Sequence, residues 1–128
     1  MIYVDSSVAL AYLLAEASRP SPEFWDLELV SSRLLEYEVW NRIHARYMAE
    51  VRSRETQTLL AGVRMIDMTG DVLARALRLW PTPIRTLDAL HLATAEYLRR
   101  EGETIEVASF DSRLITGARA LGIPIAAL

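Results

Sequence analysis

The sequence predicts an α/β fold of three layers, in which a central, mainly parallel sheet of five strands is covered by helices on both faces. Short runs rich in β-branched and apolar residues alternate along the chain with longer segments of helical periodicity. No internal repeat, low-complexity tract or linker interrupts this alternation. The chain has 128 residues, which is close to the usual size of one domain. We therefore expect a single domain over residues 1–128.

Five short apolar runs are the expected strands. They cover residues 2–4, 29–31, 65–68, 105–108 and 123–125. The helical connections between them imply parallel pairing, because a crossover helix packs on a face of the sheet. The last run contains Pro124, which has no N–H group and cannot bond on both sides. We therefore expect the fifth strand at an edge of the sheet.

The segments between the strands are expected to be helical. The predicted helices cover residues 7–15, 32–49, 54–63, 69–79, 86–100 and 111–121, with a short helical turn around Phe24 and Trp25. Hydroxyl side chains that can cap free N–H groups stand at three of the N-termini, namely Ser6 or Ser7, Ser32 and Thr69. Two helices have periodic apolar faces. These faces contain Leu35, Val39, Ile43 and Tyr47 in the first, and Leu87, Leu90, His91, Thr94 and Leu98 in the second.

The composition excludes several chemistries. Because there is no cysteine, disulfide bonds, zinc–thiolate sites and a thiol nucleophile are excluded, and carboxylates and two histidines remain as metal or acid–base groups. All fourteen basic residues are arginine. Without lysine, P-loop nucleotide hydrolysis, Schiff-base catalysis and aspartyl-phosphate chemistry each lose a required group.

Charge and hydropathy indicate which partners the protein can bind and where in the cell it is expected. The net charge of −3 is unusual for a protein that binds nucleic acid. If four acids form a metal site, however, the rest of the chain is slightly basic, and the planar arginine group suits phosphate. No apolar run is long enough to cross a bilayer, and the N-terminus lacks the features of a secretory signal. We therefore expect a cytoplasmic protein that does not enter the membrane.

Acidic residues follow the predicted strands at the edge where the functional sites of parallel sheets lie. Asp5 directly follows the first strand, and Asp111 comes soon after the fourth. Asp88 and the pair Glu36 and Glu38 fall in the first turns of helices that begin near the same edge. Clustered carboxylates repel one another unless a cation binds them, and oxygen ligands favour Mg²⁺ or Mn²⁺. Because such ions activate water and stabilise charge on phosphorus, the pattern predicts hydrolysis of phosphodiester bonds.

Each of these acids also has a structural explanation. Asp5 and Asp111 are well placed to be ordinary helix N-caps. Asp88 could stabilise the positive end of its helix dipole, and Glu38 could form an ion pair with Arg42 four residues later. It is their joint placement at one edge, rather than any single acid, that points to a site.

The histidines and tryptophans have structural explanations as well. His91 falls on the apolar face of its helix, where a buried, hydrogen-bonded histidine is more common than a catalytic base. His44 is expected on the surface. Trp25, Trp40 and Trp80 could stack on nucleic-acid bases, but aromatic residues at helical spacing more often belong to the core.

Four segments of the chain resemble, in order, the segments of VapC-type PIN domains. They are Asp5-Ser6-Ser7, Ser32 to Glu38, Arg85 to Ala95 and Ser109 to Leu114, and the third is the most specific. The resemblance covers the whole chain and implies the PIN fold. It also implies a catalytic Mg²⁺ or Mn²⁺ site formed by Asp5, Glu38, Asp88 and Asp111. Ser7 and Ser109 would support that site.

Two residues could supply the glutamate of the site. The family spacing from Ser32 selects Glu38, at the edge of the apolar stripe, whereas helical periodicity selects Glu36, within the stripe. Two residues apart on a helix are roughly 200° apart around its axis, so both carboxylates cannot face one site. We favour Glu38, because a side chain at the edge of the stripe can reach the mouth of a crevice.

The resemblance also implies a function. VapC-type PIN proteins are endoribonuclease toxins that cut structured RNA, such as tRNA or ribosomal RNA, form homodimers and are inhibited by a VapB antitoxin. The implied function is that of the toxin in a VapBC toxin–antitoxin pair. Two alternatives remain: a PIN nuclease of RNA processing without a toxin role, and a non-catalytic binding module on the same fold.

Overall fold

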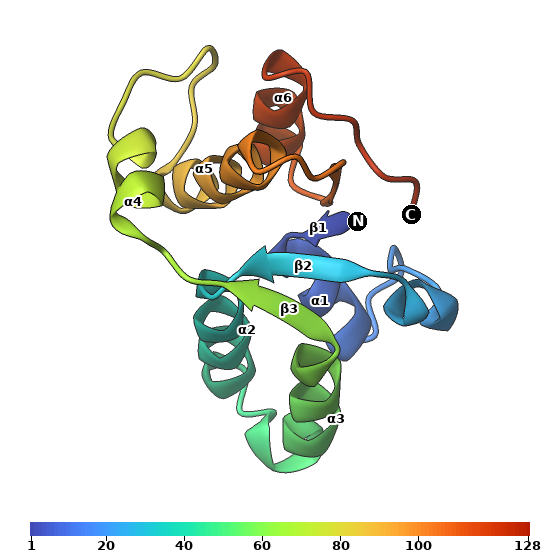
Figure 1. Ribbon diagram of the computed structural model, residues 1–128. Helices are drawn as coiled ribbons and strands as arrows, with labels where there is room; N and C mark the ends of the chain where they lie inside the picture. The colour runs from blue at the N-terminus through green and yellow to red at the C-terminus, as the bar shows by residue number, and fades with distance from the viewer.

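The computed structural model describes the whole chain, Met1–Leu128, and has an α/β architecture (Figure 1). The strands are β1 (Ile2–Val4), β2 (Leu29–Ser32), β3 (Val63–Ile66) and β4 (Glu106–Ala108). The helices are α1 (Ser6–Leu13), the 3₁₀ helix η1 (Pro22–Asp26), α2 (Leu34–Ala45), α3 (Ala49–Ala61), α4 (Gly70–Ala76), α5 (Thr86–Arg100) and α6 (Ser112–Ala120). None of the helices is both long enough and apolar enough to span a membrane.

The sheet is parallel throughout, in the order β3-β2-β1-β4. Tyr3 of the inner strand β1 lies opposite Val30 of β2 and Val107 of β4. The parallel arrangement confirms the prediction from helical crossovers, and it places the carboxyl ends of all strands at one edge.

The prediction of five strands was wrong, because the sheet has four. The segment expected as the fifth strand makes a single parallel bridge between Val107 and Ile125. Val107 N–H donates to Pro124 O at 2.8 Å, and Ala126 N–H donates to Val107 O at 2.9 Å. Pro124 has no N–H group with which to extend the ladder, so the pairing stops after one residue.

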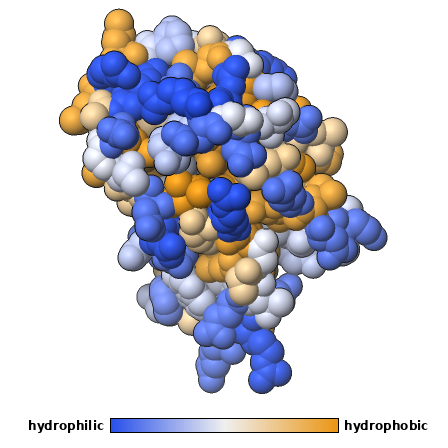
Figure 2. All heavy atoms as spheres, in the orientation of Figure 1, coloured by the Kyte–Doolittle hydropathy of each residue, from blue (hydrophilic) through white to orange (hydrophobic).

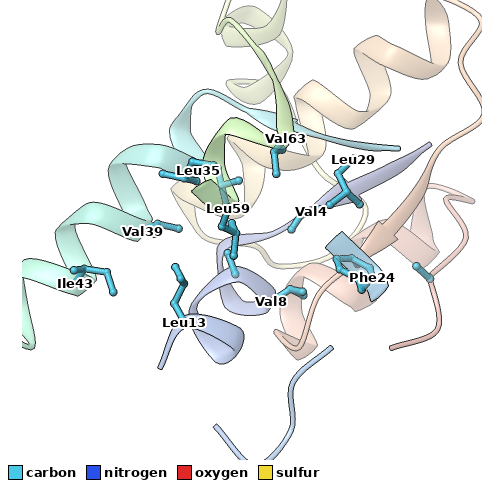
Figure 3. Packing of buried hydrophobic residues seen from close by; sticks show 14 residues of the cluster. Val4, Val8, Leu13, Phe24, Leu29, Leu35, Val39, Ile43, Leu59 and Val63 are labelled. Atoms are coloured by element: carbon cyan, nitrogen blue, oxygen red, sulfur yellow. The ribbon is translucent and has the colours of Figure 1, made fainter. Parts of the chain in front are cut away.

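Alternate residues of the strands face two separate layers of helices, which gives the three layers that were predicted. Val4, Leu29 and Ala108 pack into a core with residues of α1, α2 and α3, as Figure 3 shows for Val4 and Leu29. Their neighbours Tyr3, Val30 and Val107 face the opposite way, into a core with residues of α5 and α6. In Figure 1 these two groups of helices lie on opposite sides of the sheet.

Several predicted helix ends differ from the structure. Helix α2 ends at Ala45, and Tyr47, expected in its buried stripe, has φ of 56° and is 93% exposed. Met48 N–H donates to Ile43 O and closes this turn, after which α3 begins at Ala49 rather than near residue 54. Helix α4 stops at Ala76 instead of residue 79. The predicted bounds of α5 agree with the structure, although Leu87 in its first turn is 46% exposed.

Candidate active site

The acidic residues gather at the carboxyl edge of the sheet, where β1 and β4 end side by side. Val4 and Ala108 are the last paired residues of these strands, and Asp5 N–H donates to Ala108 O at 3.0 Å. The chain then turns from β1 into α1 at Asp5 and from β4 toward α6 through Ser109. The two turns therefore lie against each other.

Asp5 is held in place by two serine hydroxyls. Its carboxylate is buried, and its Oδ2 accepts hydrogen bonds from Ser7 Oγ at 2.7 Å and Ser109 Oγ at 2.8 Å. Each serine also accepts a backbone N–H, Ser7 from Phe110 at 2.9 Å and Ser109 from Asp111 at 2.9 Å. The other oxygen of Asp5, Oδ1, accepts no hydrogen bond.

Asp111 and Asp88 both lie at helix N-termini. Asp111 caps α6, and its Oδ1 accepts from the N–H groups of Arg113 at 2.8 Å and Leu114 at 3.3 Å. Asp88 lies in the first turn of α5, and its Oδ2 accepts from Arg85 N–H at 3.3 Å. Asp5 caps α1 in the same way, in place of the expected Ser6 or Ser7. The structural explanations for the three aspartates are thus correct, but capping uses only one oxygen of each.

Glu38 enters the site from the first half of α2. Its Oε1 lies 2.5 Å from His91 Nε2, and its Oε2 accepts from Ser6 Oγ at 3.2 Å. No ion pair joins it to Arg42. Glu36 instead makes a 3.5 Å ion pair with Arg33, so the structure places Glu38, and not Glu36, at His91, which also lies near Asp5.

A buried chain of hydrogen bonds supports Glu38. Tyr3 Oη accepts from Ser32 N–H at 3.1 Å and lies 2.7 Å from His91 Nδ1, to which it can donate its hydroxyl proton. When the imidazole is neutral, this order places its proton on Nε2, which donates to Glu38. The same nitrogen lies 3.9 Å from Asp5 Oδ1. His91 is thus the buried, hydrogen-bonded histidine that the sequence predicts, and it also lies near the carboxylates of both Glu38 and Asp5.

The charges at this edge act on one another. Partial burial raises the pKa of Asp88, and the nearby charges of Asp111 and Asp5 raise it further, although Arg85 N–H and His91 oppose them. Burial alone lowers the pKa of His91, but the hydrogen bond and charge of Glu38, with the charges of Asp5 and Asp88, raise it above its usual value. Burial also raises the pKa of Tyr3, so its hydroxyl remains protonated. The charges of Asp111 and Asp5 therefore disfavour the ionisation of Asp88, as neighbouring carboxylates do.

The donor set suits a hard divalent cation. Asp5 Oδ1, Asp88 Oδ1 and Asp111 Oδ2 accept no hydrogen bond, while the partner oxygen of each is fixed by protein donors. As the side chains stand, no three acidic or histidine residues are grouped closely enough to hold a metal ion directly. Mg²⁺ usually keeps several waters and takes only one or two carboxylates directly, so this spacing fits an ion held partly through water.

Sequence reasoning did not anticipate the roles of Tyr3, Ser6 and His91 in holding Glu38. One signal was available for His91. It follows Asp88 by three residues on the same helix, so the two side chains share a face. The contact between Tyr3 and His91 depends on the packing of α5 on β1, which no local pattern reveals.

Comparison with known proteins agrees with this geometry. Residues 2–119 match the PIN domain family. The chain is also 30% identical over 129 residues to Ribonuclease VapC47 from Mycobacterium tuberculosis (strain CDC 1551 / Oshkosh), an alignment that covers 95% of this chain and 93% of that protein. The chain belongs to the PIN-domain family. Within it, the chain is of the VapC type, and the matched residues of this PIN domain include all four candidate acids.

The positions of the two glutamates lead to a test of the site. Glu38→Gln is expected to weaken Mn²⁺ binding, measured by isothermal titration calorimetry, by at least about tenfold, since even residues that only support metal ligands cost 10–100-fold. Glu36→Gln is the matched control, because it removes the same charge two residues away on the same helix. It is expected to bind Mn²⁺ as the wild type does, and the reverse result would assign the site glutamate to Glu36.

Proposed function

We propose that this PIN domain is a metal-dependent endoribonuclease and the toxin of a VapBC toxin–antitoxin pair. The observation that supports this most is the edge of the sheet, where Asp5, Asp88 and Asp111 each have a carboxylate oxygen without a hydrogen bond, and where Glu38 meets His91 near Asp5. The name of the related ribonuclease supports cleavage of RNA in particular.

The chain's own residues have distinct tasks in this proposal. Asp5, Glu38, Asp88 and Asp111 hold Mg²⁺ or Mn²⁺ and are the catalytic acids. When bound, the cation supplies an activated water and neutralises charge on the phosphate. Ser7 and Ser109 fix the buried carboxylate of Asp5, and His91 and Ser6 fix Glu38. The protein therefore orients Asp5 and Glu38 before RNA arrives.

The proposed partners follow from the same surfaces. The substrate would be structured RNA, such as tRNA or ribosomal RNA, in the cytoplasm. A VapB-like antitoxin would compete with it by placing an arginine against the open carboxylates, where bidentate pairing is strong. A homodimer is supported by apolar side chains that are exposed along α4 and the segment after it, namely Leu73, Leu77 and Leu79.

The first prediction of the proposal concerns metal and acid together. The protein is expected to cleave RNA with Mg²⁺ or Mn²⁺ and to lose cleavage in excess EDTA, because only carboxylates are available as ligands. Asp88→Asn is expected to lower the rate more than about 100-fold, beyond the effect typical of supporting residues. Asp26→Asn, an exposed change in η1, is the control and is expected to cleave normally. Full activity in EDTA would contradict the proposal.

The toxin role is tested in cells. Expression of the chain alone is expected to arrest the growth of a bacterial host, and Asp88→Asn, which keeps its N–H acceptor for the helix cap, is expected to be harmless. Co-expression of the small protein encoded beside the gene is expected to restore growth. A wild-type chain that cleaves RNA in vitro but does not slow growth would favour the alternative, an RNA-processing nuclease.

A further inference from the structure

Four arginines gather beside α4 and the C-terminal half of α5. Arg75, Arg78, Arg99 and Arg100, together with Glu96, line a hollow of about 390 Å³ that has no apolar lining residue. We call these five residues the arginine hollow. Figure 2 shows hydrophilic side chains gathered over the region where α4 and α5 lie in Figure 1. The concentration of positive charge is notable in a chain of net charge −3.

Arg75 is rigidly held and lacks one acceptor. Its Nε donates to Glu96 Oε2 at 2.6 Å, and its guanidinium group stacks 3.6 Å from the centre of the Trp80 ring. The side chain is only 11% exposed, and its Nη1 is buried without any hydrogen-bond partner. Buried donors in proteins are nearly always paired. Glu96 meets Nε and not Nη1, so the acceptor that Nη1 lacks is one that a ligand can supply.

The other three arginines have no carboxylate partner. Arg99 donates to the carbonyl of Leu121 at 2.9 Å, and neither Arg78 nor Arg100 forms an ion pair. The helix dipole explains cations in the last turn of α5. It also favours Arg75 in the last turn of α4, but it does not explain Arg78, which lies in the segment after that helix. Like charges drawn from two separate elements favour a shared anion, and arginine binds phosphate oxygens bidentately.

Helix α5 connects this hollow with the acidic edge. Asp88 lies in its first turn and Arg99 in its last, and eleven residues of helix span about 16 Å. A stacked strand advances about 3.4 Å per nucleotide, so about five nucleotides cover this distance. An acidic protein segment could also bind these arginines, but, unlike an RNA substrate, it would have no reason to extend to the acids at the other end of α5.

We propose that the arginine hollow binds backbone phosphates of RNA several nucleotides from the bond that is cut. The proposal rests on the ribonuclease function proposed above and adds to it a second point of attachment for the substrate. Contacts to phosphate position a nucleic acid without reading its sequence. The hollow would therefore hold RNA of any sequence and would require a substrate long enough to reach both sites.

The test measures binding and cleavage separately. Binding of a fluorescent RNA hairpin is followed by anisotropy in EDTA, where cleavage does not interfere, over a range of salt concentrations. Arg78→Ala/Arg100→Ala is the test variant, since both side chains are exposed and unpaired, whereas replacing the packed Arg75 could disturb the fold. The matched control, Arg46→Ala/Arg54→Ala, removes two exposed arginines at the end of α2 and on α3.

The test variant is expected to bind the hairpin at least about tenfold more weakly, with a slope of log affinity against log salt that is less steep by about 1.5, as for two lost phosphate contacts. The control is expected to match the wild type. In Mg²⁺, the variant should cleave the hairpin with a raised KM and an unchanged kcat. Equal RNA affinity of variant and wild type would overturn the proposal.

Two other occupants would also overturn it. A variant that binds RNA normally but changes oligomeric state in light scattering would assign the hollow to a contact between protein chains. Saturation of the wild type by inorganic phosphate, without any loss of RNA affinity in the variant, would assign it to a small anion. If the wild type binds the hairpin through these arginines but never cleaves it, the ribonuclease function fails while the arginine hollow stands.

Discussion

The parallel pairing of β1 with β4 is the interaction on which the site depends. It joins residues separated by about a hundred positions and aligns Val4 with Ala108, so that the turns after both strands meet. The strands are buried on both faces, which fixes their register, because a slip by one residue would exchange the residues that face the two cores. Asp5 and the Ser109–Asp111 turn are therefore held together by packing before any ligand binds.

This arrangement concentrates negative charge at helix N-termini, which lower the free-energy cost of placing ionised carboxylates close together. Asp5, Asp88 and Asp111 each lie in the first turn or at the cap of a different helix, where the dipole and free N–H groups favour a carboxylate. Compensation is incomplete, because the pKa of Asp88 is still raised by its partial burial and by Asp111 and Asp5. A site that is electrostatically unsatisfied on its own is suited to a cation, and the fold supplies the stability that the site lacks.

Much of this could be predicted from the sequence, and the failures have physical causes. The position of Asp5, Asp88 and Asp111 near one edge was predictable, because the ends of strands and the caps of helices leave local signals in the sequence. The prediction of a fifth strand failed because one proline limits the ladder to a single bridge. The prediction that Tyr47 is buried failed because α2 ends in a left-handed turn that periodicity does not reveal. Periodicity pointed to Glu36 and the family spacing to Glu38, and only the hydrogen bond between Glu38 and His91 in the folded protein shows which one reaches the edge of the sheet.

The central claim is that these carboxylates form a divalent-cation site, and the stability of Asp88→Asn tests it most directly. In EDTA at neutral pH the variant should exceed the wild type in free energy of unfolding, on the order of 0.5 kcal/mol, because it removes a charge that its neighbours repel. Because the folded-state pKa of Asp88 is raised, this difference should disappear as the pH falls below about 3.8, where the carboxyl is protonated in both states.

Saturating Mg²⁺ should reverse the order of the two proteins. At about 100 times its Kd, a bound ion stabilises the native state by about 2.7 kcal/mol, and this gain should appear in the wild type and be mostly lost in Asp88→Asn. Urea unfolding of both proteins in EDTA and in Mg²⁺ gives the four free energies required. Equal stabilisation of wild type and variant by Mg²⁺, or none in either, would contradict the claim that this acidic edge binds a metal.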